Sequence, residues 1–201
     1  MDLKQSAAPS PSLGRAEPVS VPANAIGDER TPNDACPRRV LVATDTSPTS
    51  AAAELAGIEL SSGVGASLVF VSVIDPSRLR LPGGLFHTRV DQVRAQRESA
   101  LVRSVANARQ LGVAAQFLIW EGDPGTAVVE AAEAEGADLL IVGNHARGAI
   151  GRRLLGSVSS HVVAHAHRPV IVIRPGQRLD NVLTQLAPGI TTAAGRSASS
   201  T

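Results

Sequence analysis

The stretch VGNHARGAIGRRLLGSVSS, from Val142 to Ser160, decides the fold of this 201-residue chain. An apolar run ends at Val142, four glycines follow within fourteen residues, and a helical pattern begins after Gly156. Glycines let the main chain approach an anion closely, and the dipole and unpaired N–H groups of a helix start stabilise negative charge. The stretch predicts a phosphate-binding loop that leads into a helix, with hydroxyl donors at Ser157 and Ser159. Alternatively, the glycines only end a strand and cap a helix.

The rest of the chain alternates between two kinds of segment. Continuous, mostly β-branched apolar runs at 39–44, 66–74, 114–120, 137–142 and 169–174 predict strands that are covered on both faces. Helical spacing at 50–60, 90–111, 125–135 and 154–165 predicts the helices between them. We therefore expect an α/β fold, a doubly wound five-stranded parallel sheet with helices on both faces and strand order 3-2-1-4-5. Such folds bind ligands at the carboxyl ends of the strands, where the strand order reverses.

Composition sets the limits of the folded unit. Residues 1–37 and 176–201 are rich in Pro, Ala, Ser and Thr, so we expect two disordered tails around one domain at 38–175.

A net charge of +1 favours neither nucleic acid nor an anionic membrane as a partner. Cys36 is the single cysteine, which leaves no intrachain disulfide and no cysteine metal cage. Without a signal-peptide pattern or an apolar stretch of membrane-spanning length, a cytoplasmic protein is expected.

Two larger classes of nucleotide-binding protein do not fit. Gly151 and Gly156 have the spacing of a P-loop, but Ser157 stands where that loop requires a lysine. The dinucleotide fingerprint GxGxxG is absent after the first strand. A phosphate-receiver domain would need paired acids at Thr44 and Asp45. No catalytic constellation emerges either, so no enzymatic activity is expected.

The loop resembles that of the universal stress protein family, whose pattern is Gly, two residues, Gly, nine residues, Gly, then Ser or Thr. Gly143, Gly156 and Ser157 match three of its positions, and Ala146 replaces the second glycine. The stretches VLVATDTS (40–47), GADLLIVG (136–143) and HRPVIVIR (167–174) also match in order and spacing. The resemblance spans 38–175, and it implies the fold expected above.

In members of this family that bind ATP, the resemblance assigns roles to individual positions. Ala43 and Thr44 would lie beside adenine and ribose, Asp45 would accept hydrogen bonds from the ribose hydroxyls, and Val73 would form an apolar wall of the adenine pocket. The phosphates would be surrounded by Gly143, His145, Ala146, Gly156, Ser157 and Val158. The methyl group of Ala146 costs about 1–2 kcal/mol if that position needs a left-handed backbone, and little if it needs only close approach.

Two functions follow from the resemblance. The first is a stress-response module that acts by binding ATP or a related adenine nucleotide, with or without Mg²⁺, rather than by turnover. The second is a dimeric interaction module that binds no nucleotide, because some family members lack the glycines and do not bind ATP. In both cases the resemblance implies a homodimer, and the apolar edge Val170–Ile173 is suited to form it.

Several of these residues have alternative interpretations. Asp45 could cap the helix that follows it, a use compatible with ribose binding. His145 could be a solvated loop residue. His161 and His165 share a helix face and His167 follows them, but no carboxylate or cysteine accompanies them, so a metal site is not expected.

Overall fold

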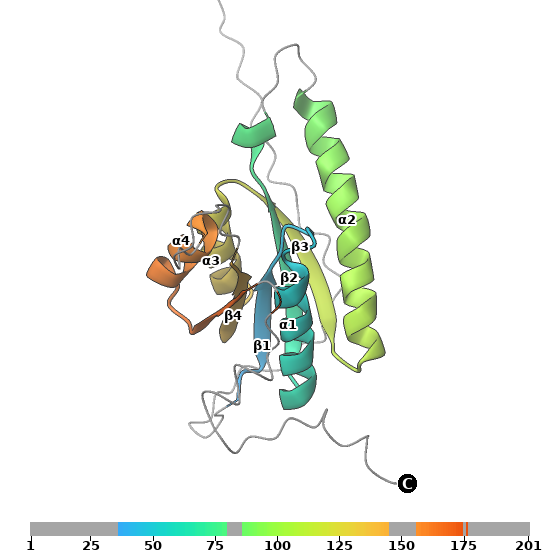
Figure 1. Ribbon diagram of the computed structural model, residues 1–201, viewed down its shortest axis with the longest axis vertical. Coiled ribbons are helices and arrows are strands. Elements are labelled where there is room, and N and C mark those ends of the chain that lie inside the picture. Colours follow the sequence, from blue (N-terminus) through green and yellow to red (C-terminus); the bar gives the residue numbers. More distant parts are fainter. Residues whose placement is uncertain (1–35, 80–85, 145–155, 175, 177–201) are drawn as a thin grey trace, which may run out of the picture.

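The computed structural model describes residues 36–79, 86–144, 156–174 and 176 (Figure 1). Residues 1–35 and 177–201 of the two predicted tails, and residues 80–85, 145–155 and 175, lie outside this part of the chain. The elements are, in order, β1 (Arg39–Ala43), α1 (Ala51–Val64), β2 (Ser67–Ile74), the 3₁₀ turn η1 (Pro76–Leu79), α2 (Phe86–Gln110), β3 (Ala115–Glu121), α3 (Pro124–Ala134), β4 (Leu139–Gly143), α4 (Ser157–His165) and β5 (Val170–Ile173).

The five strands form one parallel sheet in the order β3-β2-β1-β4-β5, as the sequence predicts. The chain first builds the sheet outward from β1 through β2 to β3, and then returns to add β4 and β5 on the other side of β1. The strand order therefore reverses between β1 and β4. In this topology, the carboxyl ends of those two strands flank the ligand position typical of doubly wound folds.

Helices cover both faces of the sheet (Figure 1). Alternate residues of β1 point to opposite faces, so Val40 and Val42 pack with α1 and α2, while Leu41 packs with α3 and α4. All three are fully buried. This double burial explains why the strands are continuous apolar runs in the sequence.

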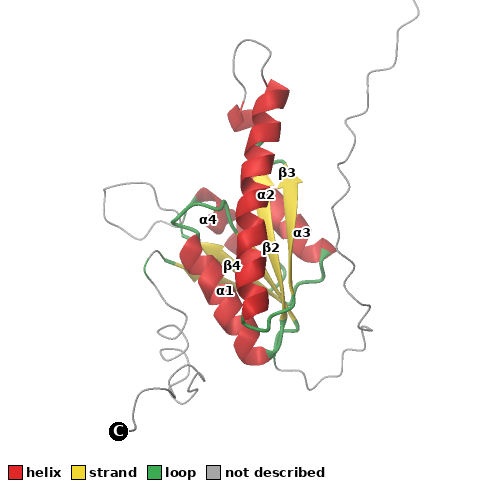
Figure 2. Cartoon of the chain, turned by 90° about the vertical axis from the view of Figure 1, so that its right-hand side faces the viewer, coloured by secondary structure: helices red, strands yellow, loops and turns green. Residues whose placement is uncertain are grey.

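Two helices are longer than the sequence pattern predicts. α1 continues past residue 60 to Val64, because Gly63 is tolerated inside it, and it ends at Gly65 in the left-handed conformation (φ 72°). α2 begins at Phe86 rather than at residue 90, and η1 occupies part of the expected connector. Figure 2 shows that the start of α2 extends beyond the carboxyl ends of the strands.

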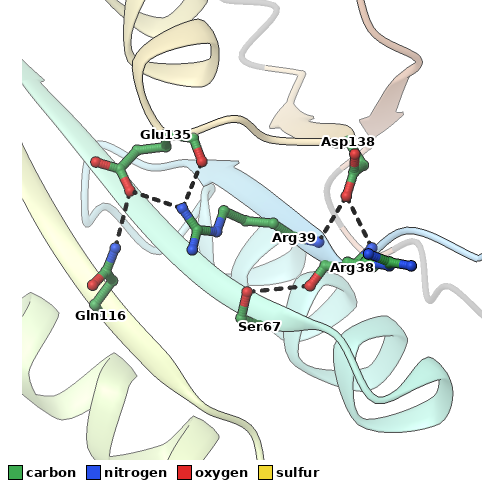
Figure 3. A network of polar contacts seen from close by, with 6 residues as sticks. All are labelled: Arg38, Arg39, Ser67, Gln116, Glu135 and Asp138. Atoms are coloured by element: carbon green, nitrogen blue, oxygen red, sulfur yellow. Dashed lines mark hydrogen bonds and ion pairs between the residues drawn. The ribbon is translucent and has the colours of Figure 1, made fainter. Parts of the chain in front are cut away.

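A polar network closes the opposite, amino end of the sheet (Figure 3). Asp138 accepts hydrogen bonds from the backbone N–H groups of Arg38 and Arg39, at 3.0 and 3.1 Å. The Arg39 guanidinium donates to the carbonyl of Glu135 at 2.6 Å and lies 3.6 Å from its carboxylate, which also accepts from Gln116. These contacts join the starts of β1, β3 and β4.

Candidate functional site

The candidate site lies at the carboxyl ends of β1, β2 and β4, beside the start of α4. Ala43 ends β1 and pairs with Val71 on one side and Val142 on the other, so it lies at the centre of the sheet edge. Gly143 is the last residue of β4. Strand order thus brings the predicted residues 43–45, 73, 143 and 156–158 to one end of the sheet.

The loop after β1 is held by a chain of hydroxyl contacts. The Thr44 hydroxyl lies 2.9 Å from the Ser50 hydroxyl, donates to the Glu54 carboxylate and accepts the N–H of Thr46 at 2.9 Å. The same carboxylate accepts from Ser104 of α2 at 2.6 Å. Thr44 is buried, and its hydroxyl is used to fix the loop.

Asp45 is exposed directly after this anchored residue. Its Oδ1 accepts the backbone N–H of Ser47 at 3.0 Å, which forms a local turn. The interpretation of Asp45 as the cap of the following helix is wrong, because α1 begins at Ala51 and its N-cap is Ser50. The carboxylate is instead presented at the sheet edge by a loop that turns tightly at Thr46, which has a φ of 61°.

On the other side of β1, Asn144 joins the two ends of the glycine-rich loop. Its N–H donates to the carbonyl of Ile173 at 2.7 Å, and its Oδ1 accepts the N–H of Gly156 at 3.1 Å. A single side chain therefore fixes the start of α4 against the end of β4, twelve residues earlier in the chain. Gly156 has φ −60° and ψ 159°, which any residue can adopt, so a left-handed backbone is not the reason for glycine here.

The first turn of α4 contains the predicted serines. Ser157 is exposed and Val158 half-buried, and the N–H groups of a first helical turn have no intrahelical acceptor. The helix dipole adds partial positive charge at the same place. Ser159 differs from expectation, because its side chain is buried and its hydroxyl donates to the Gly156 carbonyl at 3.0 Å. The serine suited to meet a ligand is therefore Ser157.

The carboxyl end of β2 forms the third side of the site. Val73 is buried in the core cluster on the α3 and α4 face, so most of its side chain is already covered by protein. Asp75 follows the strand and accepts the hydroxyl and N–H of Ser77, which lower the pKa of its carboxyl below the ordinary value. Arg78 adds an ion pair at 3.0 Å. The Asp75 carboxylate therefore stabilises the β2–η1 turn.

Sequence reasoning missed Arg97 of α2, which reaches this end of the sheet. Its Nη1 donates to the Ser72 hydroxyl at 2.9 Å and to the carbonyl of Val73. A signal was present, because Arg97 continues the buried helical stripe formed by Leu101, Val105 and Ala108. A charged side chain on the apolar face of a helix needs polar partners, because burying an unpaired charge is costly. Arg97 finds these partners at the carboxyl end of β2.

Two predicted residues, His145 and Ala146, lie outside the described residues. Among the residues that are described, no group of three or more His, Cys, Asp or Glu side chains is placed to hold a metal ion. The rings of His161 and His165 stack at 4.1 Å on α4. Likewise, no helix in the described ranges is long and apolar enough to cross a membrane.

Comparison with known proteins yields one family. The model of the universal stress protein family matches residues 37–174. A universal stress protein of Methanocaldococcus jannaschii is 30% identical over 139 residues, which cover 68% of this chain and 82% of that protein. Universal stress proteins of Thermus aquaticus and M. jannaschii match over shorter stretches, 42% and 40% of their lengths.

Two solved structures that resemble this chain come from the same family as the sequence relatives. A universal stress family protein from Burkholderia pseudomallei has a TM-score of 0.58 and 30% identity, over 68% of this chain and 95% of that one. A universal stress protein in complex with cAMP has a TM-score of 0.53 and 27% identity, over 69% and 98% of the two chains. Residues 37–174 thus carry the sequence pattern, and the described fold the sheet order, of one family: the chain belongs to the universal stress proteins.

Proposed function

We propose that this protein binds ATP or a related adenine nucleotide at the carboxyl ends of β1 and β4, and that it acts by binding rather than by turnover. The observation that supports this most is the Asn144–Gly156 hydrogen bond of 3.1 Å, which fixes the start of α4 beside the end of β4. A helix start held at the switch point of a doubly wound sheet offers unpaired N–H groups and a favourable dipole to a phosphate.

In this proposal, the residues on the two sides of β1 contact different parts of the nucleotide. Asp45, on the loop after β1, accepts hydrogen bonds from the ribose hydroxyls, and Val73 contributes apolar surface next to the base. Gly143, Ser157 and Val158 approach the phosphates, together with His145 and Ala146 of the glycine-rich loop. The related structure in complex with cAMP supports an adenine nucleotide as the ligand class. Mg²⁺, where it takes part, would enter with the phosphates.

Asn144 provides the sharpest test of this site. Asn144→Ala removes the acceptor for the Gly156 N–H, so we expect weaker ATP binding, by about 5- to 10-fold, and a lower melting temperature. Asn144→Asp keeps the acceptor and should retain most of the stability, but its negative charge repels phosphate. ATP affinity should therefore fall in Asn144→Asp as well, and the loss should shrink at high salt.

Titration calorimetry with ATP, ADP, AMP and cyclic AMP, combined with thermal unfolding of the three proteins, measures both effects. Wild-type protein that gives neither heat nor a thermal shift at millimolar nucleotide would refute the proposal and leave the dimeric interaction module. If wild type binds and both variants bind equally well, the start of α4 is not the phosphate site.

We also propose that the protein is a homodimer formed through β5. β5 is an edge strand, and Val170, Ile171 and Val172 are only partly buried in the single chain. Pairing with a second copy would satisfy the outward backbone groups of this edge and cover its apolar side chains.

A further inference from the structure

Thr46 is the strained point of the loop that follows β1. Its φ of 61° lies in the left-handed region, which a β-branched residue rarely adopts. A backbone strained in this way persists only where the surrounding structure holds it. The contacts that hold this turn therefore decide how Asp45, the residue before Thr46, is presented at the carboxyl end of the sheet.

Two hydroxyl groups hold the turn from inside the protein. The Thr44 hydroxyl accepts the N–H of Thr46 at 2.9 Å. The Ser50 hydroxyl donates to the Ser47 carbonyl, also at 2.9 Å. The hydroxyl oxygens of Thr44 and Ser50 lie 2.9 Å apart, and both side chains are buried. Ser50 is the N-cap of α1, yet its side chain makes no capping hydrogen bond, so its hydroxyl stabilises the turn rather than the helix.

Glu54 of α1 connects this turn to α2. One of its carboxylate oxygens accepts from the Thr44 hydroxyl, and the other accepts from the Ser104 hydroxyl of α2 at 2.6 Å. Glu54 lies in the first turn of α1, where the helix dipole favours any acidic residue. The dipole does not require the side chain to be half-buried between hydroxyl groups of two other segments. These inward contacts indicate that the carboxylate holds the loop.

We propose that Glu54 is a positioning residue of the nucleotide site: its carboxylate holds Thr44, which holds the strained turn that presents Asp45 to the ribose. Ser104 fixes the same carboxylate from α2. This inference rests on the proposed nucleotide-binding function and adds a residue of α1 to it. Because Glu54 acts on the turn that carries Asp45, its removal affects the part of the affinity that depends on the sugar hydroxyls.

The test compares ATP with 2′,3′-dideoxy-ATP, which has the same base and phosphates but no sugar hydroxyls. Affinities of wild type, Glu54→Ala, Glu54→Gln and the control Glu98→Ala are measured by calorimetry. Glu98 is an exposed glutamate of α2. We expect wild type and Glu98→Ala to prefer ATP by about 10- to 100-fold, as hydrogen bonds to a carboxylate allow.

The preference for ATP should fall by at least about 3-fold in Glu54→Ala, because the turn loses its support. In Glu54→Gln it should stay within about 2-fold of wild type, because the amide oxygen can accept from Thr44 while the amide nitrogen donates to the Ser104 oxygen. A purely structural role of Glu54 would weaken both ligands equally in Glu54→Ala and leave the preference unchanged, which would overturn the inference. A loss in Glu54→Gln as large as in Glu54→Ala would also overturn it.

A double-mutant cycle shows whether Glu54 acts through Thr44. Thr44→Val removes the hydroxyl and should lower the preference about as much as Glu54→Ala, and the double variant should lower it no further. Additive losses would refute the positioning role. If Glu54→Ala does not fold, as judged by circular dichroism, Glu54→Asp takes its place. Its carboxylate keeps the charge but is too short to reach both hydroxyl groups, so an unchanged preference refutes the role.

The outcomes also separate this inference from the proposal beneath it. Wild type that binds ATP and dideoxy-ATP equally would show a nucleotide site in which Asp45 does not contact the sugar, and the role of Glu54 would be wrong while nucleotide binding stands. Wild type that binds neither ligand would refute the nucleotide site itself, and the positioning role with it.

Discussion

Gly57 shows how closely α1 packs on the central strand. A β-carbon at this position would lie 2.3 Å from Cγ2 of Val42 and 3.4 Å from Cδ1 of Leu68, and both side chains are fully buried. Val42 is β-branched and held in the middle of β1, so it has little freedom to move away. Glycine is needed here for close approach of helix and sheet rather than for an unusual backbone conformation.

Gly57→Ala should therefore destabilise the protein. The overlap with Val42 costs about 1–3 kcal/mol, which exceeds the gain of about 1 kcal/mol in helix propensity. Gly63→Ala is the matched control, since it lies in the same helix with no atom within 4 Å of the added β-carbon. We expect that variant to be as stable as wild type or slightly more so. Urea unfolding measures both, and equal stability of the two variants would contradict the packing account.

At the scale of elements, the start of α3 depends on one carboxylate. Asp123 is the N-cap, and its Oδ1 accepts the N–H and the hydroxyl of Thr126, both at 3.0 Å. These bonds lower the pKa of Asp123, the N–H of Thr126 being the larger cause. The folded pKa lies below the unfolded one, so the contribution is present above about pH 4 and is lost as pH falls through the folded pKa.

Asp123→Ala should cost about 0.5–1 kcal/mol at pH 7, at the low end for a cap because this exposed carboxylate is screened by solvent. The difference from wild type should shrink as the pH falls from 4 towards 2.5. Asp123→Asn keeps a capping acceptor that does not titrate, so its advantage over alanine should not vary with pH. Urea unfolding of the three proteins across this range checks both statements; a difference between wild type and alanine that stays constant with pH would be incompatible with them.

The order and type of the elements could be predicted from the sequence because buried parallel strands must be continuous apolar runs and the crossover helices must show helical spacing. Helix ends were harder to predict from the sequence. Nothing in the local sequence distinguishes Gly63, which lies inside α1, from Gly65, which ends that helix with a positive φ. Within the site, Asp45 and Gly156 could be found from local patterns. Arg97 gave only a partial signal, its place on the buried stripe of α2, because its partners Ser72 and Val73 are brought to it only by the folded sheet.

At the scale of the whole molecule, β5 is an edge strand among the described residues, and this edge is the surface with the clearest consequence for assembly. The carbonyls of Pro169 and Ile173 accept from Leu140 and Asn144 of β4, at 3.0 and 2.7 Å. Backbone groups alternate in direction along a strand, so those of Val170 and Val172 point away from β4. These outward groups are the ones that a second copy of the chain would pair with.

Val172→Pro removes an outward N–H and should convert the proposed dimer to a monomer with a modest loss of stability, because edge positions tolerate proline. Ile171→Pro is the contrasting variant, since it removes an N–H directed at β4 and should destabilise the fold itself. Sedimentation at micromolar concentration reports assembly, and circular dichroism reports folding. Wild type that sediments only as a monomer would contradict the proposal, as would a Val172→Pro variant that remains dimeric.

The network of Asp138, Arg39 and Glu135 at the amino end of the sheet has a consequence for ligand electrostatics. The five residues of β1 separate it from the strand ends near Asp45 by about 17 Å. Arg39 and Glu135 carry opposite charges 3.6 Å apart, so their fields largely cancel at this distance. Ion pairs at the amino end can therefore be redesigned for thermal stability with little change in the field at a nucleotide bound in the proposed site.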